Sequence, residues 1–470
     1  MQSRFCVVSG AALLGAALLA GCDEPPAPVS IAEVGPVAAS PQRPGDPAEG
    51  YRILVNEGYV SCGIPLEAFR EIQGDADAGH RLPGREGLNA ELPYAFNSTV
   101  TDDGVTLVTA NCLGCHAAEF NGELVMGLGD ETGDYTRDPV AAAEAVGAYI
   151  DDEAAAAHWR RWADRISAIA PYMTTDTVGV NPADSLTLAL IAHRDPETLA
   201  WSPEPLLALP PETPAPVSVP PWWRMQKKHA MFYSAMGRGD HARLMMTIAT
   251  FCTDTVEEAR ELDRFGPHLR AYIASLEPPE YPWQVDRALA GQGQQVFEQT
   301  CSMCHGTYGE DWSYPNRVVG LDEIGTDPLL ARHAAQESDD YIRWYNQSFF
   351  GELAEATPAL GYIAPPLDGV WATAPYLHNG SVPSIKALLD SATRPTYWKR
   401  RNWDSTDYDP ETLGWPVEVL EGGKDAQRDA ELRKLVYDTT LPGYGNQGHT
   451  FGDHLSDQDR RAVLEYLKTL

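Results

Sequence analysis

The sequence is poor in basic residues and in long apolar runs. Its 470 residues include 35 Lys and Arg against 67 Asp and Glu, a formal net charge of −32 at pH 7. This surplus of negative charge repels phosphate backbones, so we expect no nucleic-acid partner. After residue 20 there is no apolar run of about 18 residues, which argues against a further membrane-spanning helix. Hydrophobic residues still make up 43% of the chain, enough for a packed core, and the length predicts two or three domains.

The first residues carry the pattern of an export signal. Arg4 precedes an apolar stretch over residues 5–20 that is too short and too rich in Ala and Gly for a spanning helix. Leu19-Ala20-Gly21-Cys22 resembles the lipobox of bacterial lipoproteins, which predicts cleavage before Cys22 and lipid modification of its thiol. Ordinary cleavage near Ala20 and an uncleaved anchor are the alternatives. The sequence therefore predicts a protein tethered on the periplasmic side of a bacterial membrane, with inner or outer membrane left open.

Cysteine is scarce, but four of the 8 cysteines form two identical motifs. Cys112-Leu-Gly-Cys115-His116 and Cys301-Ser-Met-Cys304-His305 both have the form C-x-x-C-H, the attachment signature of c-type haem. The two thiols bond one edge of the porphyrin, and the imidazole of His116 or His305 then faces the iron. Paired zinc motifs lie about 15–20 residues apart, far closer than these two, and a βαβ context for a thioredoxin-like pair is absent. The sequence therefore predicts two covalently bound haem c groups.

Proline clusters divide the chain into units. They predict a lipoprotein signal peptide (1–21), a Pro-rich tether (22–50), an N-terminal haem c domain (51–205), a Pro-rich linker and middle segment packing between the haems (206–283) and a C-terminal cytochrome c domain (284–470). Periodic hydrophobicity is mostly helical, with few convincing strands. We therefore expect a mainly α fold with two cytochrome c-like haem domains, long loops and a helical middle segment.

The last unit has the plan of a small cytochrome c. A helix over residues 285–298 leads to Cys301, and Ser456 fits the N-cap of a terminal helix. In such domains the sixth iron ligand comes from the loop before the terminal helix, where His449 lies in a Gly-rich stretch. His454 is the second candidate, and a solvated loop histidine is the alternative. With His305 and His449 as ligands, haem 2 is a six-coordinate electron carrier without an open site.

Haem 1 has no equivalent loop downstream of His116. His158, Met173 and His193 follow the first motif without distinguishing context. Either one of them is a sixth ligand, or haem 1 is five-coordinate with an open face for O2 or peroxide. We favour the open site.

The segment over residues 222–243 has five Lys or Arg and one acid within an acidic protein. A basic, aromatic wall of this kind suits haem propionates, with Arg224 binding the cofactor, whereas an exposed patch that docks an acidic partner is the alternative. Trp222 or Trp223 is expected between the haems, where an indole shortens the path for electrons. Phe232 either lines a distal apolar pocket or packs in the core.

Cys62 and Cys252 lie outside the two haem motifs. In an oxidising compartment such thiols favour a disulfide, which would join the first haem domain to the middle segment. Two separate buried thiols are the alternative.

Taken together, the motifs resemble the bacterial di-haem cytochrome c peroxidase superfamily, and within it most closely the rubber oxygenase-like di-haem c-type cytochromes. The resemblance covers roughly residues 51–470 and rests on both C-x-x-C-H motifs, on 222–233, on 365–384 and on the loop 448–452. It implies that one haem reacts with oxygen or peroxide while the other shuttles electrons. It also implies a cofactor contact at His378 and a Ca2+ held by backbone oxygens of Thr373 and Pro375, although a loop packed against haem 2 explains the same run.

Two departures from the family limit what the resemblance implies. The peroxidases use a distal glutamate as acid and base, and no acid here lies in a recognisable peroxidase motif. The chain is also shorter than polymer-cleaving members, which argues against polyisoprene cleavage. We expect an oxidoreductase with Trp222, Trp223 and Phe232 at its catalytic centre and a periplasmic redox protein or a small-molecule oxidant as partner. The alternative is a pure electron-transfer cytochrome with both haems six-coordinate.

Overall fold

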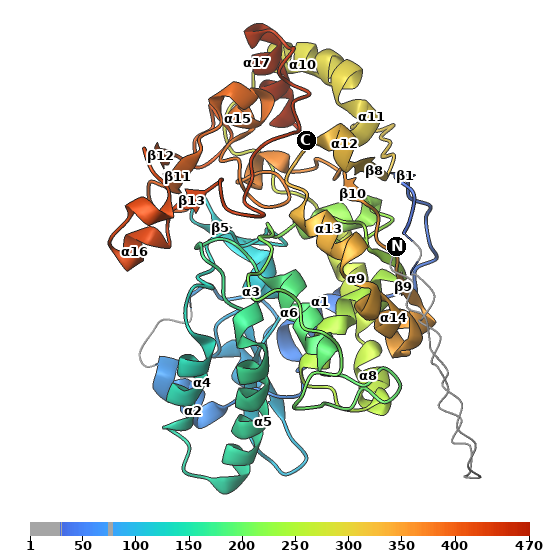
Figure 1. Ribbon diagram of the computed structural model, residues 1–470, viewed down its shortest axis with the longest axis vertical. Coiled ribbons are helices and arrows are strands. Elements are labelled where there is room, and N and C mark those ends of the chain that lie inside the picture. The colour runs from blue at the N-terminus through green and yellow to red at the C-terminus, as the bar shows by residue number, and fades with distance from the viewer. Residues whose placement is uncertain (1–28, 30, 74–78) are drawn as a thin grey trace, which may run out of the picture.

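The computed structural model describes residue 29 and residues 31–73 and 79–470 (Figure 1). The predicted signal peptide, residues 1–21, and the predicted lipid-bearing Cys22 lie outside these residues. Within the described ranges, no helix has both the length and the apolarity needed to cross a bilayer.

The predicted fold class, mainly α with two cytochrome c-like haem domains, is wrong. The chain is 39% helix and 13% strand, a mixed α/β structure with several small sheets. The strands of the described ranges are two to five residues long, too short to show a period-two pattern, and most pair with strands distant in sequence. One hairpin did leave a signal, because Thr101-Asp-Asp-Gly104 separates two runs rich in β-branched residues.

The N-terminal part, at the lower end of Figure 1, combines short helices with a three-stranded sheet of order β2-β4-β3 and the hairpin β5-β6. Asp46 caps its first helix by accepting the backbone N–H groups of Ala48 and Glu49. Gly50 lets this helix approach α9 closely, since a Cβ there would collide with the carbonyl oxygen of His268. The elements are α1 (Pro47–Asn56), β2 (Ile64–Pro65), α2 (Leu66–Gln73), β3 (Phe96–Val100), β4 (Thr106–Ala110), α3 (Leu113–His116), β5 (Ala117–Phe120), β6 (Glu123–Met126), α4 (Pro139–Gly147), α5 (Glu153–Ile169) and α6 (Ala183–Ala192).

The middle segment is mostly helical, and it packs against both the N-terminal part and the C-terminal part. Its hydrophobic residues Leu244 and Ala259 share one core cluster with Ile191 of α6 and with Trp344 and Phe350 of the C-terminal part. The predicted units are therefore joined by a common core. The elements are the 3-10 helix η3 (Trp222–Lys227), β7 (Gly237–Gly239), α7 (His241–Met245), the 3-10 helix η4 (Met246–Phe251), α8 (Val256–Asp263) and α9 (Gly266–Ser275).

The C-terminal part is built around the crossing of α10 and α17, at the top of Figure 1. Gly293 of α10 lies so close to the carbonyl oxygen of Ala462 that no side chain would fit between the helices. Ser456 caps α17 by accepting the N–H of Asp459, which confirms the predicted N-cap. The elements are α10 (Arg287–Thr300), α11 (Ser302–His305), β8 (Arg317–Gly320), α12 (Leu321–Ile324), α13 (Leu329–Gln336), α14 (Asp339–Gln347), β9 (Ala354–Ala356), β10 (Gly361–Ile363), α15 (Ile385–Leu389), β11 (Tyr397–Arg400), β12 (Val417–Val419), α16 (Ala430–Arg433), β13 (Tyr437–Asp438) and α17 (Asp457–Leu467).

Part of the segment predicted as a free tether is attached to the body. Strand β1 (Gly35–Pro36) pairs antiparallel with β8, with Gly35 opposite Val318. Farther along, the guanidinium of Arg43 lies 3.0 Å from Asp240 and 2.6 Å from Asp263. Residues 31–46 therefore lie across the middle and C-terminal parts rather than extending away from them.

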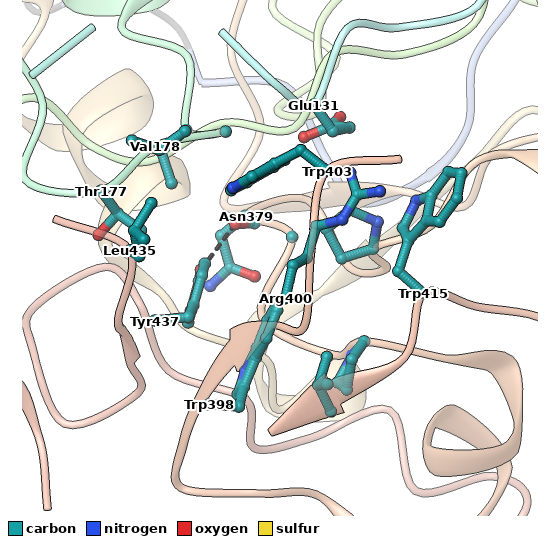
Figure 2. Close-up of a pocket in the computed structure, with 16 residues that line it drawn as sticks. Glu131, Thr177, Val178, Asn379, Trp398, Arg400, Trp403, Trp415, Leu435 and Tyr437 are labelled. Carbon is teal, nitrogen blue, oxygen red and sulfur yellow. Dashed lines mark hydrogen bonds between the residues drawn. The ribbon is translucent and has the colours of Figure 1, made fainter. Parts of the chain in front are cut away.

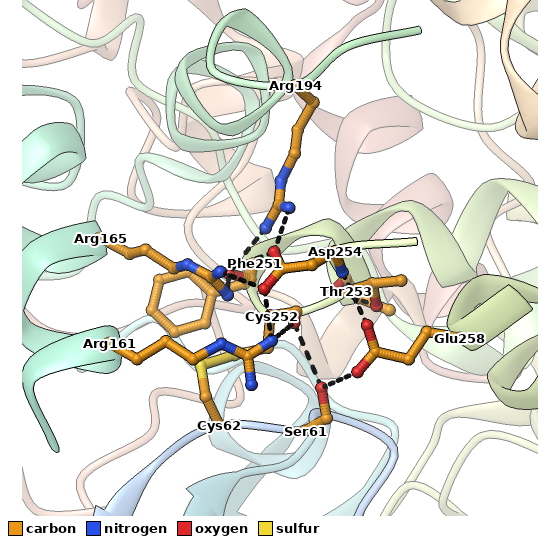
Figure 3. Close-up of a disulfide and its surroundings, with 11 residues drawn as sticks. Ser61, Cys62, Arg161, Arg165, Arg194, Phe251, Cys252, Thr253, Asp254 and Glu258 are labelled. Carbon is orange, nitrogen blue, oxygen red and sulfur yellow. Dashed lines mark hydrogen bonds and ion pairs between the residues drawn. A yellow bond between two sulfur atoms is a disulfide. The ribbon is translucent and has the colours of Figure 1, made fainter. Parts of the chain in front are cut away.

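A disulfide joins Cys62 to Cys252, which confirms the predicted bridge between the N-terminal part and the middle segment (Figure 3). The two Cα atoms are 5.4 Å apart, inside the usual range for this bond. Both cysteines are buried among the apolar residues that surround α3 and the first haem motif. The covalent link therefore holds η4 against the first candidate site.

Three arginines converge on one carboxylate beside the disulfide (Figure 3). Arg161 and Arg165 of α5 and Arg194 after α6 lie 2.6–2.7 Å from the carboxylate oxygens of Asp254. Arg165 and Arg194 also donate to the carbonyl oxygen of Phe251. Their side chains are 4% and 0% exposed, so this network fixes the residues next to Cys252 from inside the protein.

Candidate functional site

The second C-x-x-C-H motif sits where α10 ends. Cys301 is the C-cap residue of α10, and the single turn α11 carries Cys304 and His305. The Nδ1 of His305 donates to the carbonyl oxygen of Pro365 at 2.8 Å. This bond fixes the ring and leaves Nε2 as the nitrogen available to a metal, the usual arrangement behind a ligating histidine. Burial lowers the pKa of His305, so the imidazole is neutral and able to ligate.

His449 faces His305 across the second site. The two ring centres are 6.2 Å apart with an interplanar angle of 55°. A metal–imidazole bond is about 2.0 Å and the ligating nitrogen lies about 1 Å from the ring centre, so two imidazoles on one metal have centres roughly 6 Å apart. The Nδ1 of His449 is buried without a hydrogen-bond partner in the described part of the chain, and burial lowers its pKa to about 4. These two imidazoles fit the axial ligands of a haem between them.

The loop that carries His449 is clamped from outside. Arg394 donates to the carbonyl oxygens of Asn446, Gly448 and His449 at 2.7–3.0 Å, and the N–H of His449 donates to Ile324. Gly448 has a positive φ of 74° and packs on Gly325 with no room for a side chain. His449 itself has a φ of 44°, so its position depends on these contacts. The other candidate in this region, His454, is exposed.

The first C-x-x-C-H motif forms the turn α3 between β4 and the β5-β6 hairpin. The backbone N–H of Cys112 donates to the Tyr59 hydroxyl, and the Cys115 sulfur lies 3.4 Å from the Tyr135 hydroxyl. The ring of His116 stacks on Trp222, with centres 4.9 Å apart. Burial lowers the pKa of His116 to about 4, and a hydrogen bond to the Pro220 backbone partly opposes this. The cysteines of both motifs have free thiols, as haem attachment requires.

The two adjacent tryptophans of η3 divide between the two sites. Trp222 belongs to the core cluster of Leu113 and Ala117 around the first motif. Trp223 belongs to the cluster of Phe297 that backs the second motif, and its indole N–H donates to the carbonyl oxygen of Asp368 at 2.8 Å. Together they connect the two candidate haem sites, and their predicted catalytic role stays a prediction.

Two of the five basic residues of the predicted wall are ion-paired within the protein. Lys227 lies 2.7 Å from the carboxylate of Asp368, and Arg243 lies 3.1 Å from that of Asp263. Arg224 instead donates to the carbonyl of Asp368, and burial lowers its pKa. Arg224, like Lys228 and Arg238, has no ion pair among the described residues, and its predicted role toward a haem carboxylate stays a prediction.

Phe232 and His378 have different surroundings. Phe232 has a positive φ of 67° in the turn closed by Met231 and Gly237, and it is 39% exposed. His378 is buried; its ring stacks on Tyr362 with centres 4.0 Å apart, and burial lowers its pKa to about 3. Their predicted roles, catalytic for Phe232 and cofactor-binding for His378, stay predictions.

The Thr373 side chain has contacts of its own in the loop of the suggested calcium site. The Thr373 hydroxyl donates to the carbonyl of Val370 and lies 3.4 Å from the guanidinium of Arg224, a cation that would repel Ca2+. Among the described residues, no group of three or more His, Cys, Asp or Glu side chains could hold a metal ion. These observations concern side chains and not the backbone oxygens of Thr373 and Pro375, so the suggested calcium site stays a prediction.

The candidate sixth ligands of haem 1 have other partners. The Nε2 of His158 lies 3.0 Å from the carboxylate of Asp103. His193 donates from Nδ1 to the carbonyl of Ser202 and stacks on Trp201. Met173 packs against Tyr172 and Leu190 in a separate apolar cluster. The Nε2 of His193, however, is buried without a hydrogen-bond partner among the described residues, so the sixth ligand of haem 1 stays a prediction.

Comparisons with known proteins point to the second site. Residues 361–399 match the family described as RoxA-like, cytochrome c-like, which implies haem c. The chain is 30% identical over 290 residues to the uncharacterized protein y4iJ of Sinorhizobium fredii (strain NBRC 101917 / NGR234), covering 47% of the chain and 46% of that protein. It is 33% identical over 236 residues to the uncharacterized protein y4iM of the same strain, covering 42% and 52%. The chain thus matches about half the length of these curated relatives, and the family match supports the resemblance to rubber oxygenase-like cytochromes only coarsely.

Proposed function

We propose that the chain is an exported, lipid-anchored di-haem c-type cytochrome that acts as an oxidoreductase. The family match supports a haem c cytochrome, and two C-x-x-C-H motifs with free thiols support two attachment sites. Bound haem supplies an iron that changes between ferrous and ferric states.

The observation that carries the proposal is the pairing of His305 with His449. Their 6.2 Å separation and the Pro365 carbonyl behind His305 suit axial ligation from both sides. Arg394 fixes the His449 loop, so the sixth ligand is held before any partner arrives. We assign electron transfer to this second site, because His305 and His449 would hold a bound haem from both sides and leave no room for a substrate at its iron.

The first site is proposed as the centre that reacts with O2 or H2O2. His116 supplies one axial ligand and is held against Trp222. His158 is held by Asp103, whereas the Nε2 of His193 has no partner among the described residues. We propose that neither histidine would bind this iron, which would leave the opposite face open. Trp222 and Trp223, packed in the clusters of the first and second sites, give electrons a short aromatic route between them. The partner is a periplasmic redox protein or a small oxidant.

A direct test is the mass of the exported full-length chain. We expect two covalently attached haems, and one in a variant with Cys112→Ala and Cys115→Ala. The intact chain should consume H2O2 or O2 in the presence of a reductant, and the variant should lose at least nine-tenths of that rate. A mature mass without haem would refute the cytochrome assignment, and two haems without any turnover would refute the catalytic one.

A further inference from the structure

Arg400 is a half-buried arginine without an ion pair among the described residues. Among the described residues its side chain makes no hydrogen bond or ion pair, and its Nε is fully enclosed. Its guanidinium instead lies over the rings of Trp415 and Trp403, at 4.0 and 4.7 Å from their centres. Burial lowers its pKa to about 10, so the group is still charged at neutral pH. A buried, unpaired charge is costly, and such groups normally meet an opposite charge.

The guanidinium faces a small, partly open cavity whose wall also holds a carboxyl group (Figure 2). The cavity has a volume of about 30 Å³, enough for roughly two waters. Glu131 lies on this wall, and both of its hydrogen bonds, from the Ser218 hydroxyl at 2.7 Å and the Val219 N–H at 2.9 Å, end on Oε1. Its Oε2 is therefore the oxygen available to a ligand.

Glu131 is neutral at physiological pH. Burial raises its pKa to about 8, although the hydrogen bonds from Ser218 and Val219 oppose the shift. A neutral carboxyl group is a hydrogen-bond donor, whereas an ionised one only accepts. The cavity thus offers a guanidinium with donors on one side and a neutral O–H donor on the other.

We propose that Arg400 and Glu131 form a binding site for a single carboxylate group. A carboxylate has two oxygens, the space of about two waters, and the fork of an arginine binds it in a bidentate manner. The rings of Trp403 and Trp415 hold the guanidinium in place. The carboxylate comes either from a free monocarboxylate such as formate or from a propionate of haem 1. The attachment turn of haem 1 lies next to Glu131, because the Asp130 N–H donates to the carbonyl oxygen of Cys115. The haem propionate as ligand rests on the proposed function, whereas a free monocarboxylate does not.

The site should weaken as Glu131 ionises. Burial raises the pKa values of the three phenols near Glu131 above the normal range. The charged or titratable groups that face Glu131 are Asp130 from its own segment, Arg400 from β11, and the phenols of Tyr135, Tyr233 and Tyr437. Between pH 7 and 9, Glu131 is therefore the one among them that titrates. Its negative charge would repel a carboxylate, so we expect affinity to fall about tenfold from pH 7 to pH 9.

The test compares two adjacent arginines in the haem-loaded full-length chain. Arg400→Gln removes the proposed fork, and Arg401→Gln, at an exposed residue, makes the same charge change outside the cavity. If the ligand is free, calorimetry with formate should show one site in the wild type and in R401Q, and at least tenfold weaker binding in R400Q. If a propionate fills the site, the wild type takes up no formate, but infrared spectra with carbon-13-labelled propionates should show a carboxylate band shifted by R400Q and not by R401Q.

Glu131→Gln keeps the proposal testable if R400Q does not fold. Gln still donates a hydrogen bond but cannot ionise, so formate affinity, or the position of the propionate band, should no longer change between pH 7 and 9. The absence of any difference between R400Q and R401Q in both measurements, or a pH dependence that survives in E131Q, would overturn the proposal. If the purified chain carries no haem, its mass will show this, and the calorimetry with formate still tests the site for a free carboxylate.

Discussion

Asp254→Asn is expected to lower the free energy of unfolding by about 3 kcal/mol, because removing one partner of a buried ion pair costs about 3–5 kcal/mol. The substitution leaves Arg165 and Arg194, almost fully buried, without a counter-charge. The carboxylate of Asp254 is itself 34% exposed, and screening by water places the effect at the lower end of that range. Burial alone would raise the pKa of Asp254, yet hydrogen bonds from Arg165 and Arg194 lower it to about 2.

The matched control is Asp164→Asn on the same helix, α5. Asp164 is exposed, so the same loss of charge should change stability by no more than about 0.5 kcal/mol. Urea denaturation of both variants, followed by circular dichroism with the disulfide intact, measures the difference. Equal midpoints for D254N and D164N would show that the arginine cluster does not stabilise the fold.

His449→Ala is expected to remove the low-spin signal of haem 2 entirely. Because haem 2 is one of two haems, the spectrum of half of the total haem should change. The variant deletes the imidazole 6.2 Å from that of His305 and leaves no other histidine in the clamped loop 446–449. The iron would then keep one protein ligand, and its position opposite His305 would open to water or to added imidazole. Absorption and electron paramagnetic resonance spectra of the ferric protein report this change.

His454→Ala is the matched control, five residues farther along the same loop and exposed to solvent. It should leave both haem signals unchanged, and added imidazole should restore the low-spin signal in H449A alone. A low-spin haem 2 in H449A, or its loss in H454A, would place the sixth ligand elsewhere.

The features that the sequence predicted correctly, the disulfide and the Ser456 cap, are local or rest on rare residues. The C-x-x-C-H spacing placed the four thiols, and cysteine arithmetic predicted the Cys62–Cys252 bridge. The Gly-rich stretch around His449 and the Ser456 cap predicted that a loop with the candidate ligand is followed by the terminal helix. These features depend on residues close together in sequence or on a count of rare residues.

Features that depend on distant contacts left no such signal. Arg394 clamps the His449 loop by donating to backbone carbonyl oxygens. Every residue has such an oxygen, so the residue types at positions 446–449 do not predict this contact. Glu131 and Arg400 meet only after folding, 269 positions apart in the sequence. The small sheets were missed for the same reason, since β1 pairs with β8 across most of the chain and two paired residues show no periodicity.

Electron paramagnetic resonance of the fully oxidised full-length protein tests the central claim most directly. We predict one low-spin ferric haem, ligated by His305 and His449, and one high-spin ferric haem at His116, in equal amounts. A spectrum without any high-spin ferric signal would contradict the open site, and the protein would then be a pure electron-transfer cytochrome.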